Sequence, residues 1–286
     1  MQKMYEGGEG GGPPEYPVEP RAGITSKLKY NLEGLIPLIL IIIIVAFLGH
    51  KFGFWDIPFL GGEQPMQMLI IGQPSTDFTN ILNQNKDLVS YYIRSADHLN
   101  INPKEQLSRY DVVVLDQHLM TKKEVSSQLG DAIQDYVRSG GKFITIMDSG
   151  IRRTGASDVL GWKATFGDIV PVSCERTGET DVPSCTNRIH LAGYIERDDY
   201  KHPIMQGIER APAEGYAPYY LETFQVVVTE SRGQVAYILN ADRTGEWYPG
   251  IVEKKLVIGK SIYFGYDPGK TRGILENTLK YLKGKI

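Results

Sequence analysis

The chain has 286 residues, enough for one large or two small domains. Its 31 basic and 34 acidic residues nearly balance, so no chain-wide field favours nucleic acid or steers acidic substrates toward it. The hydrophobic and charged fractions, 42% and 23%, are ordinary, and the informative features are therefore local.

The first 31 residues are dominated by Gly, Pro and Glu and offer no apolar face that could offset the entropy of ordering them. We expect residues 1–31 to form a disordered tail. It would act as a solvated spacer or as a docking segment for a partner.

An uncharged and almost wholly apolar run follows, from Leu35 to Gly49. As a helix it spans roughly 22 Å, and the addition of Leu32 and the aromatic residues up to Trp55 makes a plausible bilayer crossing. A buried core helix would show a polar stripe, and a cleaved signal would show a small-x-small site; the run has neither. The sequence predicts a single transmembrane anchor over 32–55.

Basic residues near this run predict its orientation. Arg21, Lys27 and Lys29 precede it, whereas only Lys51 follows closely. The positive-inside rule then puts the N-terminus in the cytoplasm and the C-terminal part outside the cell membrane. The expected partners are the membrane, through residues 32–55, and other membrane or envelope proteins, with no nucleic acid.

After a Pro- and Gly-punctuated linker over 56–65, one domain over 66–286 is expected. Its first half alternates apolar strands with amphipathic helices, which predicts an α/β fold with a doubly wound sheet. The expected strands are 66–72, 90–96, 110–117 and 142–150, and the expected helices follow Ser75 and span 121–141. The second half is richer in strands.

Tyr and Trp gather at 216–224 and 247–248. Such clusters can line sugar or peptide sites, and they can equally pack the edge of a sandwich.

The two cysteines, Cys174 and Cys185, flank a polar loop. The spacing favours a disulfide, which needs an oxidising compartment. Free thiols or half a metal site are the alternatives, but His190 is a lone neighbour and zinc is disfavoured. No motif predicts a cofactor or a metal.

The order of elements resembles the class I glutamine amidotransferase-like family. The stretches that carry the resemblance are "YDVVVLDQ", "LGDAIQDYVRSGGKFITIMDSG", "HPIMQGI" and "GKSIYFGYDPGKTRGILENTLKYL". The resemblance implies a flavodoxin-like three-layer sandwich with a mostly parallel sheet, here behind a single transmembrane helix.

Active members of that family carry a cysteine at the sharp turn that ends the strand corresponding to 142–150. They also carry a His-Pro-Glu motif after a late strand. This chain has Asp148 in place of the cysteine, and Gly265-Tyr266-Asp267-Pro268 without a histidine. A thiolate mechanism needs both groups in contact. The expectation is a non-catalytic domain, a pseudoenzyme that serves as a binding or scaffold subunit of a membrane or envelope assembly.

Polar residues at the carboxyl ends of neighbouring parallel strands should gather at one edge of the sheet. The predicted ligand-binding residues are Gln73, Ser75, Asp116, Gln117, His118, Asp148, Ser149, Arg152 and Arg153. They could bind a small polar or anionic ligand, or simply cap turns and pair with surface acids.

Two other functions stay open. One is an envelope-directed hydrolase with Asp148, Ser149 and His118 as its catalytic residues. The other is an extracytoplasmic ligand sensor.

Overall fold

The computed structural model describes residues 35–46, 64–174 and 184–286. The chain divides into two units, Met1–Ile57 and Pro58–Ile286, and each is considered by itself. The predicted tail over 1–31, residues 56–63 of the predicted linker and both ends of the predicted anchor lie outside the described residues.

The first unit contributes one helix, over residues 35–46. Within the described part of the chain, no helix combines the length and the apolar character that a bilayer crossing requires. The predicted transmembrane helix, and with it the predicted location in the cell membrane, is corrected on this finding.

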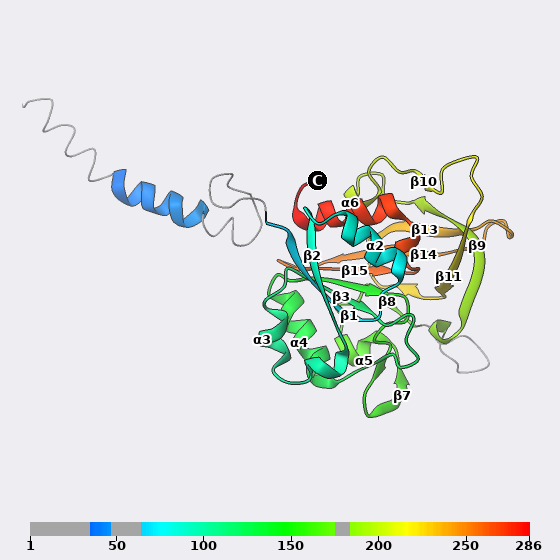
Figure 1. Ribbon diagram of the computed structural model, residues 1–286, viewed down its shortest axis with the longest axis horizontal. Coiled ribbons are helices and arrows are strands. Elements are labelled where there is room, and N and C mark those ends of the chain that lie inside the picture. The colour runs from blue at the N-terminus through cyan, green and yellow to red at the C-terminus, as the bar shows by residue number, and fades with distance from the viewer. Residues whose placement is uncertain (1–34, 47–63, 175–183) are drawn as a thin grey trace, which may run out of the picture. The chain divides into compact units, whose positions relative to one another are not determined.

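The second unit is built on one large sheet (Figure 1). Its strand order is β10-β9-β13-β14-β15-β5-β3-β1-β2, and β11 pairs with β9 beside this path. The strands are β1 (Met66–Gly72), β2 (Val89–Arg94), β3 (Val112–Asp116), β5 (Lys142–Ile146), β9 (Arg188–Arg197), β10 (Arg210–Ala211), β11 (Tyr219–Phe224), β13 (Gln234–Asn240), β14 (Trp247–Lys255) and β15 (Lys260–Phe264).

This sheet is mixed. Strands β2, β1, β3, β5 and β15 pair in parallel in this order, and helical segments lie between β1, β2, β3 and β5 along the chain. From β15 onward, every further pairing, through β14, β13, β9, β10 and β11, is antiparallel. The predicted flavodoxin-like sandwich with a mostly parallel sheet is therefore wrong for half of the domain, where hairpins replace strand–helix–strand units.

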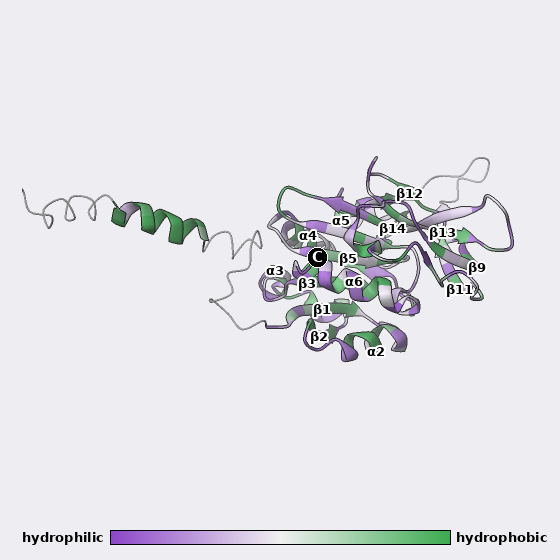
Figure 2. Ribbon diagram, turned by 90° about the horizontal axis from the view of Figure 1, so that it is seen from above, coloured by the Kyte–Doolittle hydropathy of each residue, from purple (hydrophilic) through white to green (hydrophobic). Residues whose placement is uncertain are grey.

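Helices cover both faces of the sheet (Figures 1 and 2). On one face lie α2 (Thr76–Gln84) and α6 (Arg272–Lys283). On the other lie α3 (Pro103–Leu107), α4 (Ser127–Arg138) and α5 (Trp162–Phe166). The helices pack against the sheet because their apolar residues recur on the side that faces it.

Burial of the central strands explains why they read as continuous apolar runs. All five residues of β3, Val-Val-Val-Leu-Asp, are buried between the two helical layers. In Figure 2 stretches of hydrophobic colour accordingly lie along strands of the large sheet.

Short elements complete the domain. Three small strands form a second sheet, and two more form a third: β4 (Glu124–Val125), β6 (Arg152–Arg153) and β7 (Ala156–Leu160), then β8 (Val172–Ser173) and β12 (Val227–Val228). In the described part of the chain, 3-10 turns occur at η1 (Ala96–Leu99), η3 (Ser184–Thr186), η4 (Pro203–Met205) and η5 (Pro268–Lys270).

The predicted disulfide is confirmed. Cys174 and Cys185 are bonded, with their Cα atoms 5.2 Å apart. The bond joins the end of β8 to η3, immediately before β9 begins.

Candidate functional site

The carboxyl ends of β1, β3, β5 and β15 meet at one edge of the large sheet. Gly72 is level with Asp116, and Ile146 is level with Phe264. The chain at the end of β1 lies so close to β3 that a Cβ on Gly72 would stand 1.9 Å from the Asp116 carbonyl oxygen. The segments that leave these strands therefore share one small region.

A cavity of about 310 Å³ opens in this region, and we call it the strand-end pocket. This volume lies at the lower limit of small-molecule sites. Its lining residues are Ser75, Thr76, Asp77, His118, Leu119, Met147, Tyr220, Leu221, Glu222, Asp267 and Lys270.

A buried pair of side chains stands at the floor of the strand-end pocket. His118 Nδ1 lies 2.5 Å from Asp116 Oδ1, with 4% of His118 and none of Asp116 exposed. A carboxylate can only accept, so Nδ1 carries a proton and Nε2 is left as an acceptor. No described residue forms a hydrogen bond with Nε2 of His118. The pair therefore presents a basic nitrogen whose tautomer is fixed.

Electrostatics around this pair favour a basic imidazole. Burial lowers the pKa of His118, but the hydrogen bond and the charge of Asp116, helped by Asp267, more than offset it, so the pKa lies above its usual value. His118 thus combines a fixed tautomer with raised basicity at the floor of the strand-end pocket.

Ser149 is held behind the pocket rather than in it. It is fully buried, and its Oγ accepts a hydrogen bond of 2.7 Å from the backbone N–H of Gln117. Gln117 in turn accepts a bond of 2.9 Å from the backbone N–H of Gly150 through Oε1, and Trp162 Nε1 donates to the Ser149 carbonyl. Ser149 and Gln117 therefore tie the end of β5 to the end of β3.

Asp148 is engaged with two cations. Lys123 Nζ lies 3.0 Å from one carboxylate oxygen, and Arg188 Nη2 lies 3.9 Å from the other. Lys123 also donates to the carbonyl oxygens of Gln117 and His118, at 2.6 and 2.7 Å. Burial holds the pKa of Lys123 below its ordinary value although Asp148 acts against it. Asp148 therefore neutralises the lysine that fixes the backbone of His118.

The sharp turn after β5 has its unusual backbone at Met147. Its φ is +51°, which is rare for a residue other than glycine. Met147, not Asp148, is thus the residue at the turn that lines the strand-end pocket. A thioether is no nucleophile, so this turn carries no covalent chemistry of its own.

The remaining predicted residues are spread around the edge. Ser75 lines the pocket and caps α2, accepting from the N–H of Phe78. Gln73 is exposed and meets Asp116 only through its backbone, and neither Arg152 nor Arg153, in β6, lines the pocket. The roles predicted for these residues stay predictions.

Sequence reasoning did not place Glu222, Asp267 and Lys270 in the pocket wall, and it left open a sugar or peptide site for the aromatic cluster 216–224, which contains Tyr220. One signal was available for Asp267. It follows a strand end, and β15 runs parallel to β5, so it had to emerge at the same edge. Tyr220 and Glu222 come from the antiparallel half, which no strand-end argument reaches.

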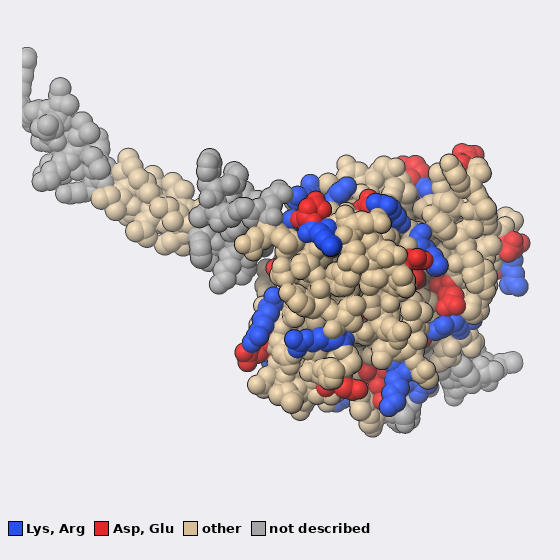
Figure 3. Space-filling view, in the orientation of Figure 1, with Lys and Arg blue, Asp and Glu red and all other residues tan. Residues whose placement is uncertain are grey.

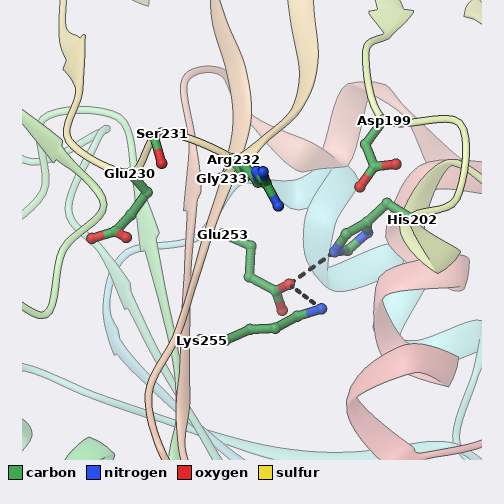
Figure 4. Close-up of a pocket in the computed structure, with 8 residues that line it drawn as sticks. All are labelled: Asp199, His202, Glu230, Ser231, Arg232, Gly233, Glu253 and Lys255. Atoms are coloured by element: carbon green, nitrogen blue, oxygen red, sulfur yellow. Dashed lines mark hydrogen bonds and ion pairs between the residues drawn. The ribbon is translucent and has the colours of Figure 1, made fainter.

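A second cavity, of about 240 Å³, surrounds His202 and Glu253 (Figure 4). His202 Nε2 lies 2.9 Å from Glu253 Oε2, while its Nδ1 accepts from the N–H of Ile204. The other Glu253 oxygen accepts from Tyr281, and Lys255 lies 3.4 Å from Oε2. Because both nitrogens of His202 are engaged, this pair locks the turn to β14 and cannot serve as a base.

The charges on the surface give no large field of one sign. On the face in Figure 3, basic and acidic side chains are interspersed. Among the described residues, no group of three or more His, Cys, Asp or Glu side chains is placed to hold a metal ion.

No family model matches the chain, and no curated protein matches it. Solved structures of similar shape include β-galactosidases from Bacillus circulans sp. alkalophilus (TM-score 0.49, 14% identity, 78% of this chain and 32% of that one) and from Halorubrum lacusprofundi (0.49, 12%, 79% and 32%). A structure described as the carbohydrate deacetylase Agd3 has a TM-score of 0.43 at 11% identity, over 77% of this chain and 33% of that one. The chain thus spans about a third of the length of each of these proteins.

Two predictions are corrected here. The predicted membership of the class I glutamine amidotransferase-like family is not supported, because no family model matches the chain. The predicted non-catalytic scaffold role, which rested on that membership, is not supported either.

Proposed function

We propose that this chain is a hydrolase in which His118 activates a water molecule in the strand-end pocket. The observation that carries the proposal is the buried His118–Asp116 pair, with its protonated nitrogen on the carboxylate and its other nitrogen unclaimed. A general base needs this combination of orientation and basicity. Among the described residues, no lining hydroxyl is hydrogen-bonded to His118, so we assign direct attack by water, and the reaction we assign is hydrolysis of a carboxylic ester.

In this reaction water attacks the ester carbonyl carbon as His118 Nε2 takes its proton. The tetrahedral intermediate then expels the alcohol oxygen, which receives that proton from His118. A carboxylic acid and an alcohol leave, and the imidazole returns to its starting state. Asp116 does not touch the substrate; it positions His118 and stabilises the transient imidazolium.

The negative charge that develops on the carbonyl oxygen needs donors. Helix α2, nine residues long, begins at the pocket, and Thr76 and Asp77 of its first turn line it. N–H groups of a first helical turn have no partner within the helix and lie at its positive end. We assign them, with the ammonium of Lys270 at the same wall, to the stabilisation of that oxygen.

The test measures hydrolysis of p-nitrophenyl acetate by the full-length chain. His118→Gln should lower kcat/KM by about 10² or more, as loss of a general base does. Asp116→Asn should lower it as well, because an amide can hold the imidazole in the other tautomer. His98→Gln is the matched control and should retain the rate, since it removes an exposed histidine outside the pocket lining. A folded His118→Gln variant with an unchanged rate would overturn the proposal.

A further inference from the structure

We infer that the substrate of this site is an ester of a neutral carbohydrate, with one face of the sugar ring against Tyr220. The inference names a substrate class and rests on the proposed function. Three features of the strand-end pocket carry it: a supported aromatic ring, hydrogen-bonding groups beside apolar ones in the lining, and the sign of its charge.

Tyr220 is a large aromatic side chain left open at the pocket. It lies in β11, is 70% exposed and lines the cavity. His190, on the neighbouring strand β9, stacks on it with ring centroids 6.1 Å apart and planes 23° from parallel. His190 Nδ1 in turn lies 3.5 Å from Glu222 Oε1. One face of the Tyr220 ring is thus supported by protein, while the side chain stays open to a ligand.

The rest of the pocket lining is mixed, with the buried apolar side chains of Met147 and Leu221 beside polar groups. Leu119, 53% exposed, is a second open apolar side chain of the lining. The other lining side chains include the hydroxyls of Ser75 and Thr76 and the carboxylates of Glu222 and Asp267. A pyranose ring has apolar C–H faces and a rim of hydroxyl groups, so it matches an aromatic wall beside acceptors. A wholly apolar acyl group would leave these acceptors unpaired.

Charge decides between kinds of sugar. The lining holds three carboxylates, Asp77, Glu222 and Asp267, against the single ammonium of Lys270. Lys270 pairs with Asp77, and Arg188 pairs with Glu222. In the described part of the chain no lysine or arginine pairs with Asp267. Phosphorylated sugars and uronic acids would meet this excess of negative charge, whereas neutral sugars would not.

The experiment compares three esters with the full-length chain: p-nitrophenyl acetate, O-acetylated xylotetraose and O-acetylated oligogalacturonate. We expect kcat/KM to be highest for the acetylated xylotetraose. Tyr220→Ala should lower kcat/KM on that ester by roughly three- to ten-fold, the worth of one aromatic contact, and leave p-nitrophenyl acetate unchanged. Tyr220→Phe should behave as the parent because the ring, not its hydroxyl, makes the contact. Tyr216→Ala removes an equally exposed tyrosine (71%) outside the pocket and is the control.

Binding is measured separately from turnover. Saturation-transfer NMR of unacetylated xylotetraose with His118→Gln should give a signal that disappears in the His118→Gln, Tyr220→Ala double variant. Suppose that hydrolysis of p-nitrophenyl acetate depends on His118, but Tyr220→Ala changes neither kcat/KM on the sugar ester nor this signal. The carbohydrate substrate is then wrong, and the proposed hydrolase activity stands. If no ester is cleaved yet xylotetraose binds through Tyr220, the hydrolase is wrong and the sugar site stands. Preference for the oligogalacturonate would overturn the charge argument.

Discussion

The protonation of His118 governs the expected pH dependence of the hydrolase. The base must be neutral, and Asp116 holds its pKa above the usual value despite burial. Hydrolysis of p-nitrophenyl acetate should therefore rise with pH, with an inflection above about 6.5. In Asp116→Asn the inflection should move to lower pH because the charge that raises the pKa is gone. An inflection in the parent below 6.5 would contradict the pairing.

The raised pKa of His118 also predicts how the stability of the protein depends on pH. Because folding raises the pKa of His118, its protonation stabilises the folded chain. This contribution is complete below the unfolded-state pKa of about 6.5 and is lost as pH rises through the higher folded-state value. Urea unfolding of the parent and of His118→Gln should therefore differ more at pH 6 than at pH 9. His98→Gln, which removes an exposed histidine, is the control.

Ser149 should matter for stability and not for chemistry. Ser149→Ala leaves the buried N–H of Gln117 without its acceptor, at a cost of about 1–3 kcal/mol in the free energy of unfolding. The rate of ester hydrolysis by the folded variant should stay near that of the parent. Chemical denaturation and the p-nitrophenyl acetate assay check the two halves, and a loss of 10²-fold or more in rate without loss of stability would make Ser149 a participant.

At the scale of elements, the close approach of β1 and β3 shapes the strand-end pocket. Gly72→Ala places a Cβ against the Asp116 carbonyl at a backbone φ of +123°. Gly215→Ala is the matched control, because it also has positive φ, +87°, but open space around its Cβ. We expect about 1 kcal/mol of destabilisation for Gly215→Ala from φ alone. Gly72→Ala should cost clearly more and should reduce hydrolysis, since Asp116 must shift. Thermal unfolding of both variants tests this expectation. Equal losses of stability in the two variants would contradict it.

The helices and strands in the first half of the domain could be predicted because each depends on a pattern among neighbouring residues. The strand over 66–72 occurs as expected, and the buried Val/Leu strand expected over 110–117 is shorter, Val112–Asp116. Helix α4 begins later than the predicted 121, because Ser126 caps it and the preceding residues pair as β4. The strand after it ends at Ile146, since Met147 takes a positive φ that no local pattern announces.

What the sequence could not supply is pairing over long distances. Nothing in β9 or β11 says that they join the large sheet antiparallel and bring Tyr220 and Glu222 beside His118. The burial of Ser149, which removes it from the pocket, likewise depends on Gln117, 32 residues earlier. Predicting that polar strand ends converge was possible; predicting which of them face the cavity required the packed structure.

At the scale of the whole molecule, the apolar core lies entirely within the second unit. The described core runs from Met66 to Leu282. We therefore expect a fragment of residues 64–286 to unfold cooperatively at the same midpoint as the full chain and to retain its hydrolysis of p-nitrophenyl acetate. Calorimetry and the assay on both chains check this. A lower midpoint for the fragment would show that residues 1–63 contribute to the fold.

The disulfide connects global stability to the strand-end pocket. Cys174 and Cys185 are 11 residues apart, and opening a loop of that size costs about 3 kcal/mol in the chain-entropy account. Cys185 is buried just before β9, whose first residue, Arg188, donates to the His118 carbonyl at 3.3 Å. Reduction should therefore lower the free energy of unfolding by about that amount and also slow hydrolysis, because the start of β9 loosens.

Urea unfolding and ester hydrolysis with and without a phosphine reductant measure both effects. The Cys174→Ser, Cys185→Ser double variant should have the stability and the rate of the reduced parent, and the reductant should change neither. This control separates loss of the bond from other effects of reduction. If reduction destabilises the parent while the rate of hydrolysis per folded molecule is unchanged, then the contact between Arg188 and the His118 carbonyl does not depend on the disulfide. The Arg188 contact would in that case persist without the bond, and Arg188→Met should still slow hydrolysis in the reduced protein.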